Sequence, residues 1–447
     1  MGMLDRVLGA IGRRLHPLFN PHAPWLRDRV ETIVAEQRRE LKKVRGLLER
    51  QESEMERLHR DFETVKNKAN SDATAVRKTV RGLHTRVSRQ LGFSERVLKR
   101  ATEATQSYRE ERVLVRLEKL ARGNAPILIG PWTGEVGFEL VYWIPFVRWA
   151  IAHYAIDPAR LVVCSRGGPA SWYRGLATRY VDVFDVASQD EFRRHTVVTP
   201  KQRTLRSFDR EILRRAVAAR GLGAVSVLHP AMMYHLFMPY WKQQAPMSQV
   251  LNYSQYVPLE PFEAPEVQGR LPAEVEGRLP AEVEGRLPAR YVAVRFYFSQ
   301  CFPDTPANRA FVGRALSQLA EETDVVILNP GLRVDDHDDV LVPRSPRIHT
   351  LDDVMRPERN LEIQASVMSR AAGFVGTYGG YSYLAPFFGT PSLSFYSERN
   401  FYYHHLHMAQ HAIDAAGGAT LTVVSTSDAA LLRSVVGGSA ARSSIPS

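Results

Sequence analysis

Apolar residues recur at seven-residue intervals in the N-terminal region. Val34, Leu41, Leu48, Met55 and Phe62 share one heptad position. The alternate core positions are mostly apolar too, and they are Gln37, Val44, Gln51, Leu58 and Val65. This pattern predicts a coiled coil within residues 28–120, and a shift of phase near Val76 indicates a stutter. A coiled coil implies self-association, giving a homo-oligomer, or docking to a partner. The alternative is one long helix folded back on the chain.

A shorter amphipathic pattern opens the chain. Within residues 1–27, apolar residues from Met3 to Phe19 follow helical spacing, with Arg6, Arg13 and Arg14 among them. Such a segment either rests on a lipid surface or packs against its own protein.

From residue 125 onward, short apolar runs alternate with helical patterns. The first round predicts strands at 127–130, 160–165 and 181–186, and helices at 138–154, 171–180, 205–220 and 229–243. The second predicts strands at 291–298, 324–329, 373–379 and 391–397, and helices at 308–322, 361–370 and 382–389. This alternation is typical of parallel sheets with helices on their faces. We therefore predict an α/β protein with two Rossmann-like domains, at 125–255 and 291–435.

The segment between these domains contains a repeat. The sequences EVQGRLPA, EVEGRLPA and EVEGRLPA follow one another within residues 266–289. Three such short units with Gly and Pro bury little, so we interpret 256–290 as a linker. The Gly/Ser-rich residues 436–447 are expected to be a disordered tail.

The excess of positive charge is confined to the N-terminal region. Residues 1–124 hold 28 of the 59 Lys and Arg and 17 of the 48 Asp and Glu, so the rest of the chain is neutral. A neutral body argues against a nucleic-acid groove. The basic arm suits an anionic membrane surface or is a solvated helix.

Two features indicate a cytoplasmic protein, at most peripheral on the inner face of the membrane. The chain has only two cysteines, Cys164 and Cys301, both in apolar runs, so no disulfide framework is expected. Its start lacks a signal-peptide pattern, and it has no apolar run of membrane-spanning length.

The most specific motif lies around residues 374–397. An apolar strand ends at Gly376 and Thr377, then Gly379, Gly380, Tyr381 and Ser382 open a helix that stops before Pro391. Glycines let a backbone approach a phosphate, and the amides at a helix N-terminus bind it. The alternative is an ordinary strand–turn–helix corner.

This motif resembles the donor-binding corner of GT-B glycosyltransferases, in particular the heptosyltransferase-like group. The similar stretches are Gly379–Ala385, then Gly389-Thr390-Pro391, with Asn360 and Gln364 on the preceding helix. Tyr378 and Tyr383 depart from that group's Asp and His. The resemblance implies a GT-B fold, no cofactor, a nucleotide-sugar as co-substrate, and donor contacts from these residues.

The resemblance also assigns a role to the loop after the first strand, residues 130–139. In the similar enzymes this loop faces the cleft and holds the catalytic base, a role that Glu135 matches best and Glu139 second. Trp132 and Gly134 would then line the acceptor side. For each Glu the alternative is charge compensation at a helix N-terminus.

Two arginines follow predicted strands at the expected cleft. Arg295 is a candidate donor contact, because a buried arginine needs an anionic partner. Asn308, further along the chain, is a second candidate donor contact. Arg166 is a candidate contact to acceptor or donor, and a structural ion pair is the alternative for Arg295.

Metal sites are not expected. The acidic run Asp335–Asp339 falls in a polar loop, and the histidines at 404, 405 and 407 lack convincing ligand spacing. These histidines, with Tyr402 and Tyr403, more readily line a cleft.

Together these features predict a glycosyltransferase that moves a sugar from a nucleotide-sugar to a hydroxyl of a glycan or lipid-linked acceptor in cell-surface polysaccharide synthesis. We expect an inverting, metal-independent reaction. The alternatives are a non-catalytic coiled-coil scaffold and a transferase of another nucleotide-activated group.

Overall fold

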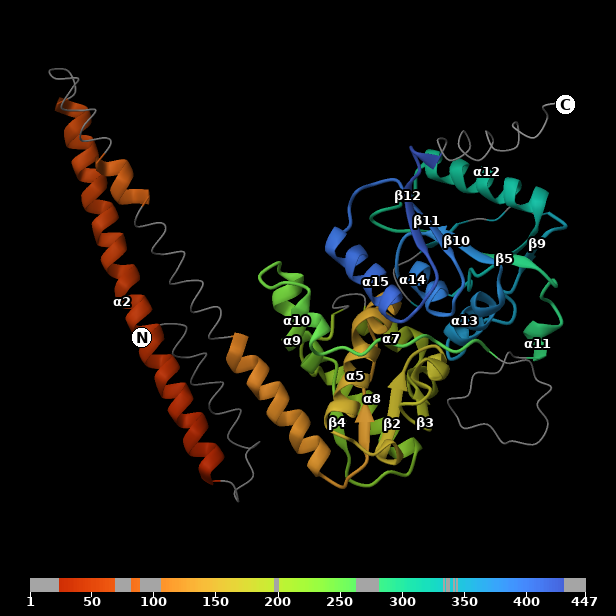
Figure 1. Cartoon of the computed structure of the whole chain (residues 1–447), viewed down its shortest axis with the longest axis horizontal. Coiled ribbons are helices and arrows are strands. Elements are labelled where there is room, and N and C mark those ends of the chain that lie inside the picture. Colours follow the sequence, from red (N-terminus) through yellow and green to blue (C-terminus); the bar gives the residue numbers. More distant parts are fainter. Residues whose placement is uncertain are drawn as a thin grey trace, which may run out of the picture. The chain divides into compact units, whose positions relative to one another are not determined.

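The computed structural model describes residues 24–68, 82–88, 106–196, 201–262, 281–332, 334, 338–340, 342 and 345–429. The chain forms two compact units, Met1–Ser107 and Tyr108–Ser447 (Figure 1), and we call the second the body. The expected lipid-facing residues up to 23, the stutter at Val76 and the tail at 436–447 lie outside the described residues. Within those residues, no helix has both the length and the apolar character needed to cross a membrane.

The first unit contains one long helix, α2 (Pro24–Lys68), where the heptad pattern predicted helix. Leu41, Leu48 and Met55 are 39%, 52% and 52% exposed, whereas Leu58 is buried. The helix is confirmed, and its pairing into a coiled coil stays a prediction.

The body begins with helical residues 108–122 and continues into a four-stranded parallel sheet. One face of that helix is buried and carries Val113, Leu117 and Leu120. The sheet has the order β3-β2-β1-β4. Its strands are β1 (Ile127–Ile129), β2 (Leu161–Ser165), β3 (Arg179–Asp182) and β4 (Ser226–Leu228). We call residues 125–262 the N-terminal half.

The helices of this half connect strands that lie parallel. They are α4 (Val136–Phe138), η2 (Glu139–Trp143), α5 (Ile144–His153), α7 (Gln189–Thr196), α8 (Ser207–Ala219), α9 (Ala231–Trp241) and α10 (Ser248–Leu251). The expected helix at 138–154 is present, but it opens with a π-helical turn over Glu139–Trp143.

Two local expectations in this half were wrong. The expected strand at 181–186 is the end of β3 followed by the helix α6 (Val183–Val186), because the Asp182 carboxylate accepts the amide of Phe184 and starts a helix there. The expected helix at 171–180 is a short 3₁₀ turn, Pro169–Tyr173, followed by β3.

The C-terminal half, residues 281–429, is built on a six-stranded parallel sheet with the order β12-β11-β10-β5-β7-β9. Its strands are β5 (Tyr291–Arg295), β7 (Asp324–Ile327), β9 (Ile348–Thr350), β10 (Gly373–Thr377), β11 (Ser392–Tyr396) and β12 (Leu421–Ser425). A separate antiparallel pair joins β6 (Tyr297–Phe298) to β8 (Asp338–Asp339). The mixed α/β class with two parallel sheets is confirmed.

The helices of the C-terminal half follow its strands. They are α11 (Ala281–Glu284), α12 (Pro306–Glu322), α13 (Asn360–Arg370), α14 (Gly380–Phe387) and α15 (Tyr403–Ala415). The third copy of the repeat contributes to α11, and its Val283 is fully buried, because an apolar residue on one helical turn can reach the core. Residues 263–280 of the expected linker lie outside the described residues.

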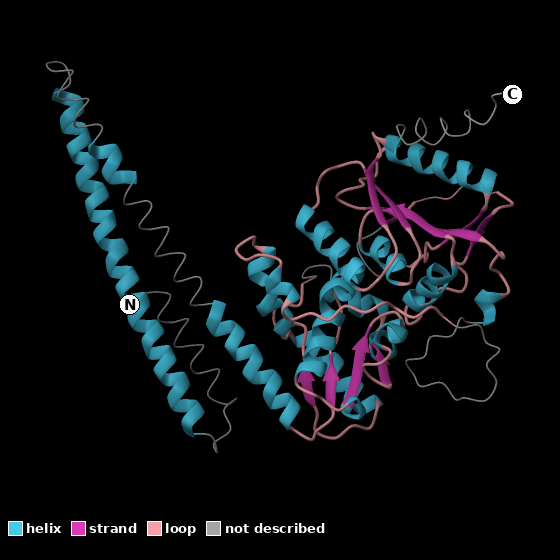
Figure 2. Cartoon of the chain, in the orientation of Figure 1, coloured by secondary structure: helices cyan, strands magenta, loops and turns pink. Residues whose placement is uncertain are grey.

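Figure 2 shows the strands of the body with helices around them. A continuous apolar core runs through both halves. Successive strand residues point to opposite faces, so Ile127 and Ile129 enter this core while Leu128 enters a second cluster beneath the first sheet. Val294 and Val325 similarly enter a third cluster on the far face of the second sheet. The shared core therefore lies between the two sheets.

Candidate active site

Each sheet has a point where the strand order reverses. In the first sheet the chain starts at β1, moves out to β3 and returns to β4 beside β1. In the second it starts at β5, moves out to β9 and returns to β10 beside β5. Ligands of open parallel sheets bind outside the carboxyl ends of the strands at such points. The two points thus define where a site is expected in each half.

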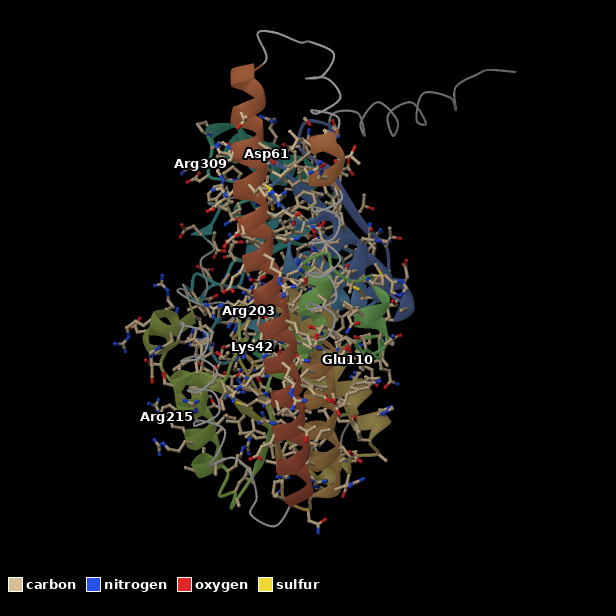
Figure 3. All side chains as sticks on the ribbon, turned by 90° about the vertical axis from the view of Figure 1, so that its left-hand side faces the viewer. Lys42, Asp61, Glu110, Arg203, Arg215 and Arg309 are labelled. Carbon is tan, nitrogen blue, oxygen red and sulfur yellow. The ribbon has the colours of Figure 1, made fainter. Side chains whose placement is uncertain are left out.

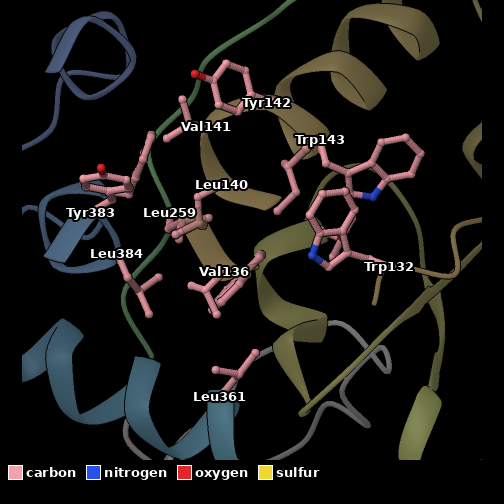
Figure 4. Packing of buried hydrophobic residues seen from close by; sticks show 14 of the residues in the cluster. Trp132, Val136, Leu140, Val141, Tyr142, Trp143, Leu259, Leu361, Tyr383 and Leu384 are labelled. Carbon is pink, nitrogen blue, oxygen red and sulfur yellow. The ribbon is translucent and has the colours of Figure 1, made fainter. Parts of the chain in front are cut away.

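The two halves meet at backbone distance between these points. A Cβ atom on Gly380 would lie 2.5 Å from the amide nitrogen of Gly137, and one on Gly137 would lie 2.9 Å from the Cα of Gly380. Figure 4 shows the apolar packing around this contact, where Val136 and Leu140 face Leu361 and Leu384. The loop after β1 and the Gly-rich turn after β10 are therefore brought together.

A second contact joins the halves beside it. The carbonyl of Gly167, after β2, accepts the amides of Leu361 and Glu362 at 2.8 and 3.1 Å. These amides belong to the first turn of α13, which has no intrahelical acceptor for them. The N-terminal half thus caps a helix of the C-terminal half.

The side chains of the Gly-rich turn hold its shape. The Thr377 hydroxyl donates to the carbonyl of Tyr297 and accepts its amide, at 2.9 and 3.0 Å. The Ser382 hydroxyl donates to the carbonyl of Gly379 and accepts its amide, at 2.7 and 3.2 Å. Thr377 and Ser382 are fully buried. Any ligand contact from this turn would therefore come from its backbone.

Besides Gly380, glycine is required at two further places in or beside the turn. Gly376 lies in β10, where a Cβ would meet the carbonyl oxygen of Arg295 at 2.2 Å. Gly379 has a φ of +156°, and a Cβ there would lie 2.2 Å from the Tyr297 hydroxyl. A larger residue at either position would therefore clash with Arg295 or Tyr297.

Arg295 ends β5 at the reversal point and is 2% exposed. Its guanidinium donates to the side-chain oxygen of Gln364 and lies 3.7 Å from the centre of the Tyr381 ring. The Gln364 amide donates to Asn360 at 3.3 Å. The structure therefore brings four predicted donor residues, Arg295, Gln364, Asn360 and Tyr381, into one group.

Asn308 lies apart from this group. Its amide nitrogen donates to the carbonyl of Pro303 at 2.7 Å and to the Ser397 hydroxyl at 2.8 Å. These bonds connect the start of α12 to the end of β11, so the observed role of Asn308 is structural.

The loop after β1 is held by side chains from elsewhere in its half. The Gln202 side chain accepts the amide of Thr133 at 3.0 Å and donates to the carbonyl of Pro131 at 2.8 Å. Arg166 donates to the carbonyl of Gly134 at 2.9 Å. Trp132 is fully buried and stacks on a neighbouring tryptophan, which makes it a core residue.

The network behind this loop is charged. Burial alone would raise the pKa of Asp209, but hydrogen bonds from His229 and Arg206 outweigh burial and lower it to about 2. Arg206 in turn donates to the Thr133 hydroxyl at 3.2 Å. An ionised Asp209 therefore anchors the loop.

Glu135 is exposed at the edge of the Gly137–Gly380 contact between the halves, and we call this edge the mouth of the candidate site. Its carboxylate pairs with Lys201 at 2.8 Å, and the side chains are 50% and 29% exposed. The Lys201 ammonium also lies 3.3 Å from the centre of the Phe138 ring. Burial lowers the pKa of Lys201, and the charge of Glu135 opposes that shift. Sequence patterns did not single out Lys201, because a lone lysine in a loop carries no periodic signal.

Glu139 lies behind the loop and is fully buried. One carboxylate oxygen accepts the hydroxyls of Ser165 and Tyr173 at 2.5 and 2.6 Å. The other has no hydrogen-bond partner among the described residues. Burial raises the pKa of Glu139 to about 7, although these hydroxyls and Arg166 oppose the shift. A π-turn carries Glu139, and such turns are frequent at functional sites.

Aromatic and histidine side chains line the same mouth. The His405 ring on α15 bonds to the Tyr142 hydroxyl at 2.7 Å across the two halves, and Phe138 packs on both rings. Burial, then His404 and Lys201, lower the pKa of His405 to about 3, so the ring is neutral. Tyr402 and Tyr403 beside it are 65% and 56% exposed.

Within the described residues, no three His, Cys, Asp or Glu side chains gather as metal ligands would. Asp335, Asp336 and His337 of the acidic run lie outside those residues.

No family model matches the chain, and no curated protein matches it. Among solved structures, the chain is similar to a glycosyl transferase family 9 protein from Veillonella parvula, with 13% identity, a TM-score of 0.36, and coverage of 70% of this chain and 89% of that one. It is also similar to E. coli heptosyltransferase WaaC with ADP, with 14% identity, a TM-score of 0.33, and coverage of 67% and 93%. WaaC with ADP-2-deoxy-2-fluoro heptose matches at 15% identity and a TM-score of 0.31, covering 62% and 90%. The chain is thus similar to glycosyltransferases, the group that its Gly-rich motif resembles, and at these values the likeness does not assign it to their families.

Proposed function

We propose that this chain is a glycosyltransferase that moves a sugar from a nucleotide-sugar to a hydroxyl of a glycan or lipid-linked acceptor. The observation that carries the proposal is the meeting of the two strand-reversal points at the Gly137–Gly380 contact. In that arrangement the donor would bind to one half and the acceptor to the other, so that the two reacting groups meet between the halves.

The donor diphosphate is assigned to the N-terminus of α14 in the C-terminal half. The positive end of a helix that starts at Gly380 favours an anion, and Arg295 ends the neighbouring strand. Arg295 would stabilise the charge on the departing diphosphate. Because Arg295 is buried and Gly379 and Gly380 are half-buried, entry of the donor requires the two halves to move apart.

Glu135 is assigned as the base, because it is the exposed carboxylate beside this contact. It would take the proton of the acceptor hydroxyl while that oxygen bonds to the sugar and the bond to the diphosphate breaks. We propose a single displacement with inversion and without a metal. Lys201 would pair with the carboxylate and fix its position.

Glu139 is proposed to position the base rather than to transfer the proton. It is buried, and its charge lies near Arg166, which donates to the carbonyl of Gly134 next to Glu135. Trp132, Thr377 and Ser382 likewise shape the site, and their side chains are not assigned to substrate.

The proposal is tested by incubating the full-length protein with a panel of nucleotide-sugars and measuring release of the nucleoside diphosphate. We expect turnover of at least one donor, and the Glu135→Gln variant to lose at least about 100-fold of that rate, because it removes a general base. Glu260→Gln is the matched control, since Glu260 is also an exposed glutamate paired with a basic side chain in the same half.

Thermal unfolding of Glu135→Gln should match the wild type, because exposed ion pairs contribute little to stability. Should the wild-type protein bind no nucleoside diphosphate and turn over no donor, the non-catalytic scaffold would replace this proposal. A cytidine-activated polyol as the only accepted donor would favour the other group-transfer alternative.

A further inference from the structure

One face of the first body helix carries a row of cations. Helical residues 108–122 bury Val113, Leu117 and Leu120 against the core. The exposed side presents four basic residues, Arg109, Arg112, Arg116 and Lys119. At about 100° per residue, these four positions fall within about 80° of one another around the helix. They form a continuous basic strip that we call the basic face.

One further cation, Arg203, extends this face beyond the histidine His235 on α9. His235 on α9 is exposed, and its pKa is lowered by burial and then by Arg109 and Arg112. A hydrogen bond with the backbone of Arg203 opposes that shift. Arg203 itself is exposed (Figure 3) and follows Lys201, the partner of Glu135. The basic face therefore reaches from the helix toward the mouth of the candidate site.

The acidic residues nearby do not neutralise this face. Glu110 accepts a hydrogen bond from Tyr253, and Glu118 pairs with Arg122. Glu111 is exposed but lies about 100° around the helix from Arg112. Within the part of the chain that the structure describes, Arg109, Arg112, Arg116, Lys119 and Arg203 form no ion pair. Like charges held together without counter-charges raise the local potential and attract anions.

The shape of the face indicates which anion it fits. Its cations stand on the outside of a helix, and one cavity among the described residues lies elsewhere, beside Ile144 and Leu259. Val115, which is 44% exposed, and Tyr108, whose ring lies 5.7 Å from the Arg112 guanidinium, border the cations. A convex row of cations edged by apolar groups suits a broad anionic surface with an apolar interior better than a small ion.

We propose that the basic face docks the body onto the anionic headgroups of a lipid bilayer. Each cation near such a surface contributes favourably, and the effect is additive over several charges. Docking in this way would hold the mouth of the candidate site near the membrane, where a lipid-linked acceptor resides. The inference rests on the charges and exposure of this face and does not require the proposed transferase activity.

The test is co-sedimentation of the full-length protein with vesicles. Vesicles of phosphatidylcholine alone are compared with vesicles that contain about one quarter phosphatidylglycerol. We expect binding to the anionic vesicles only, and the triple variant Arg109→Gln/Arg112→Gln/Arg116→Gln to bind at least about 10-fold more weakly. The variant should unfold at the wild-type temperature, because its three positions are exposed.

The matched control is Arg194→Gln/Arg210→Gln/Arg314→Gln, which removes the same charge from three exposed arginines on other helices. Its binding should stay within about 3-fold of the wild type. Equal loss in both triple variants would show attraction to net charge alone and overturn the proposal, as would unchanged binding of the first variant. Binding to a soluble sulfated polysaccharide but not to anionic vesicles would assign the face to a polyanionic glycan instead.

Discussion

Replacement of Gly380 by alanine is expected to lower the free energy of unfolding by about 3 kcal/mol and to abolish any donor turnover. The added Cβ would lie 2.5 Å from the amide nitrogen and 3.2 Å from the Cα of Gly137. Both are backbone atoms, so no side-chain rotation relieves the clash. Relief requires the loop after β1 to move away from α14. That movement would separate Glu135 from the proposed donor site.

Denaturant unfolding and the diphosphate-release assay measure the two effects. The matched control is Gly313→Ala on α12, because nothing lies within 4 Å of a Cβ there. A glycine in a helix interior costs stability, so Gly313→Ala should stabilise the protein by about 0.5–1 kcal/mol. A Gly380→Ala variant with wild-type stability and turnover would show that the two loops do not need this close contact.

The contribution of Glu139 and Asp182 to the free energy of unfolding is expected to fall as the pH rises from about 4 to about 7, whereas the lowered pKa of His405 acts in the opposite direction between its folded value of about 3 and its usual value of 6.5. Burial raises the pKa of Glu139 and of Asp182 to about 7. In the unfolded chain both groups titrate near their usual values of 4.5 and 3.8. Between these values each of the two groups holds more protons in the folded protein than in the unfolded chain, so its titration favours unfolding as the pH rises. The full shift corresponds to about 3 kcal/mol for Glu139 and about 4 kcal/mol for Asp182.

The Glu139→Gln variant isolates one of these groups. Glutamine has the shape of a protonated glutamic acid and can still accept the hydroxyls of Ser165 and Tyr173. We expect its stability to exceed the wild-type value increasingly as the pH rises from 4.5 to about 7, by about 3 kcal/mol at the upper end. Urea unfolding at several pH values measures this. The exposed Glu260→Gln serves as control and should keep the wild-type slope.

Asp182→Asn is a different kind of change. The Asp182 carboxylate accepts the amides of Gly168 and Phe184 and the Tyr180 hydroxyl. Asparagine keeps one accepting oxygen, but its NH₂ group cannot accept the hydrogen bonds of the other, so this variant should be less stable at every pH. Because Gly168 follows the carbonyl that caps α13, the change should also loosen the contact between the halves. A Glu139→Gln variant that gains no stability over the wild type between about pH 5 and about pH 7, or an Asp182→Asn variant as stable as the wild type, would contradict these expectations.

Local patterns were sufficient to predict most elements that carry an uninterrupted signal. The apolar runs at 127–130, 160–165, 324–329 and 391–397 form strands, because each is a short, β-branched or aromatic run between turn residues. The helix after Gly380 and its end before Gly389 followed from glycine and proline positions. The expected strand at 181–186 was wrong because the Asp182 side chain caps a helix that begins within this strand-like run.

The sequence by itself determined that this is an α/β chain with two parallel sheets behind a long helix, and that a Gly-rich turn follows the strand at 373–377. These properties depend on neighbours in the chain, whose spacing is visible directly. Only the tertiary structure decided that Glu135 is exposed beside Lys201 while Glu139, four residues later, is buried against Ser165 and Tyr173. It also decided that Arg295 lies against Gln364 and Tyr381, and that Gly137 touches Gly380. Each of these contacts joins residues far apart in the chain, and no local periodicity encodes which of many equally spaced partners will meet once the core has formed.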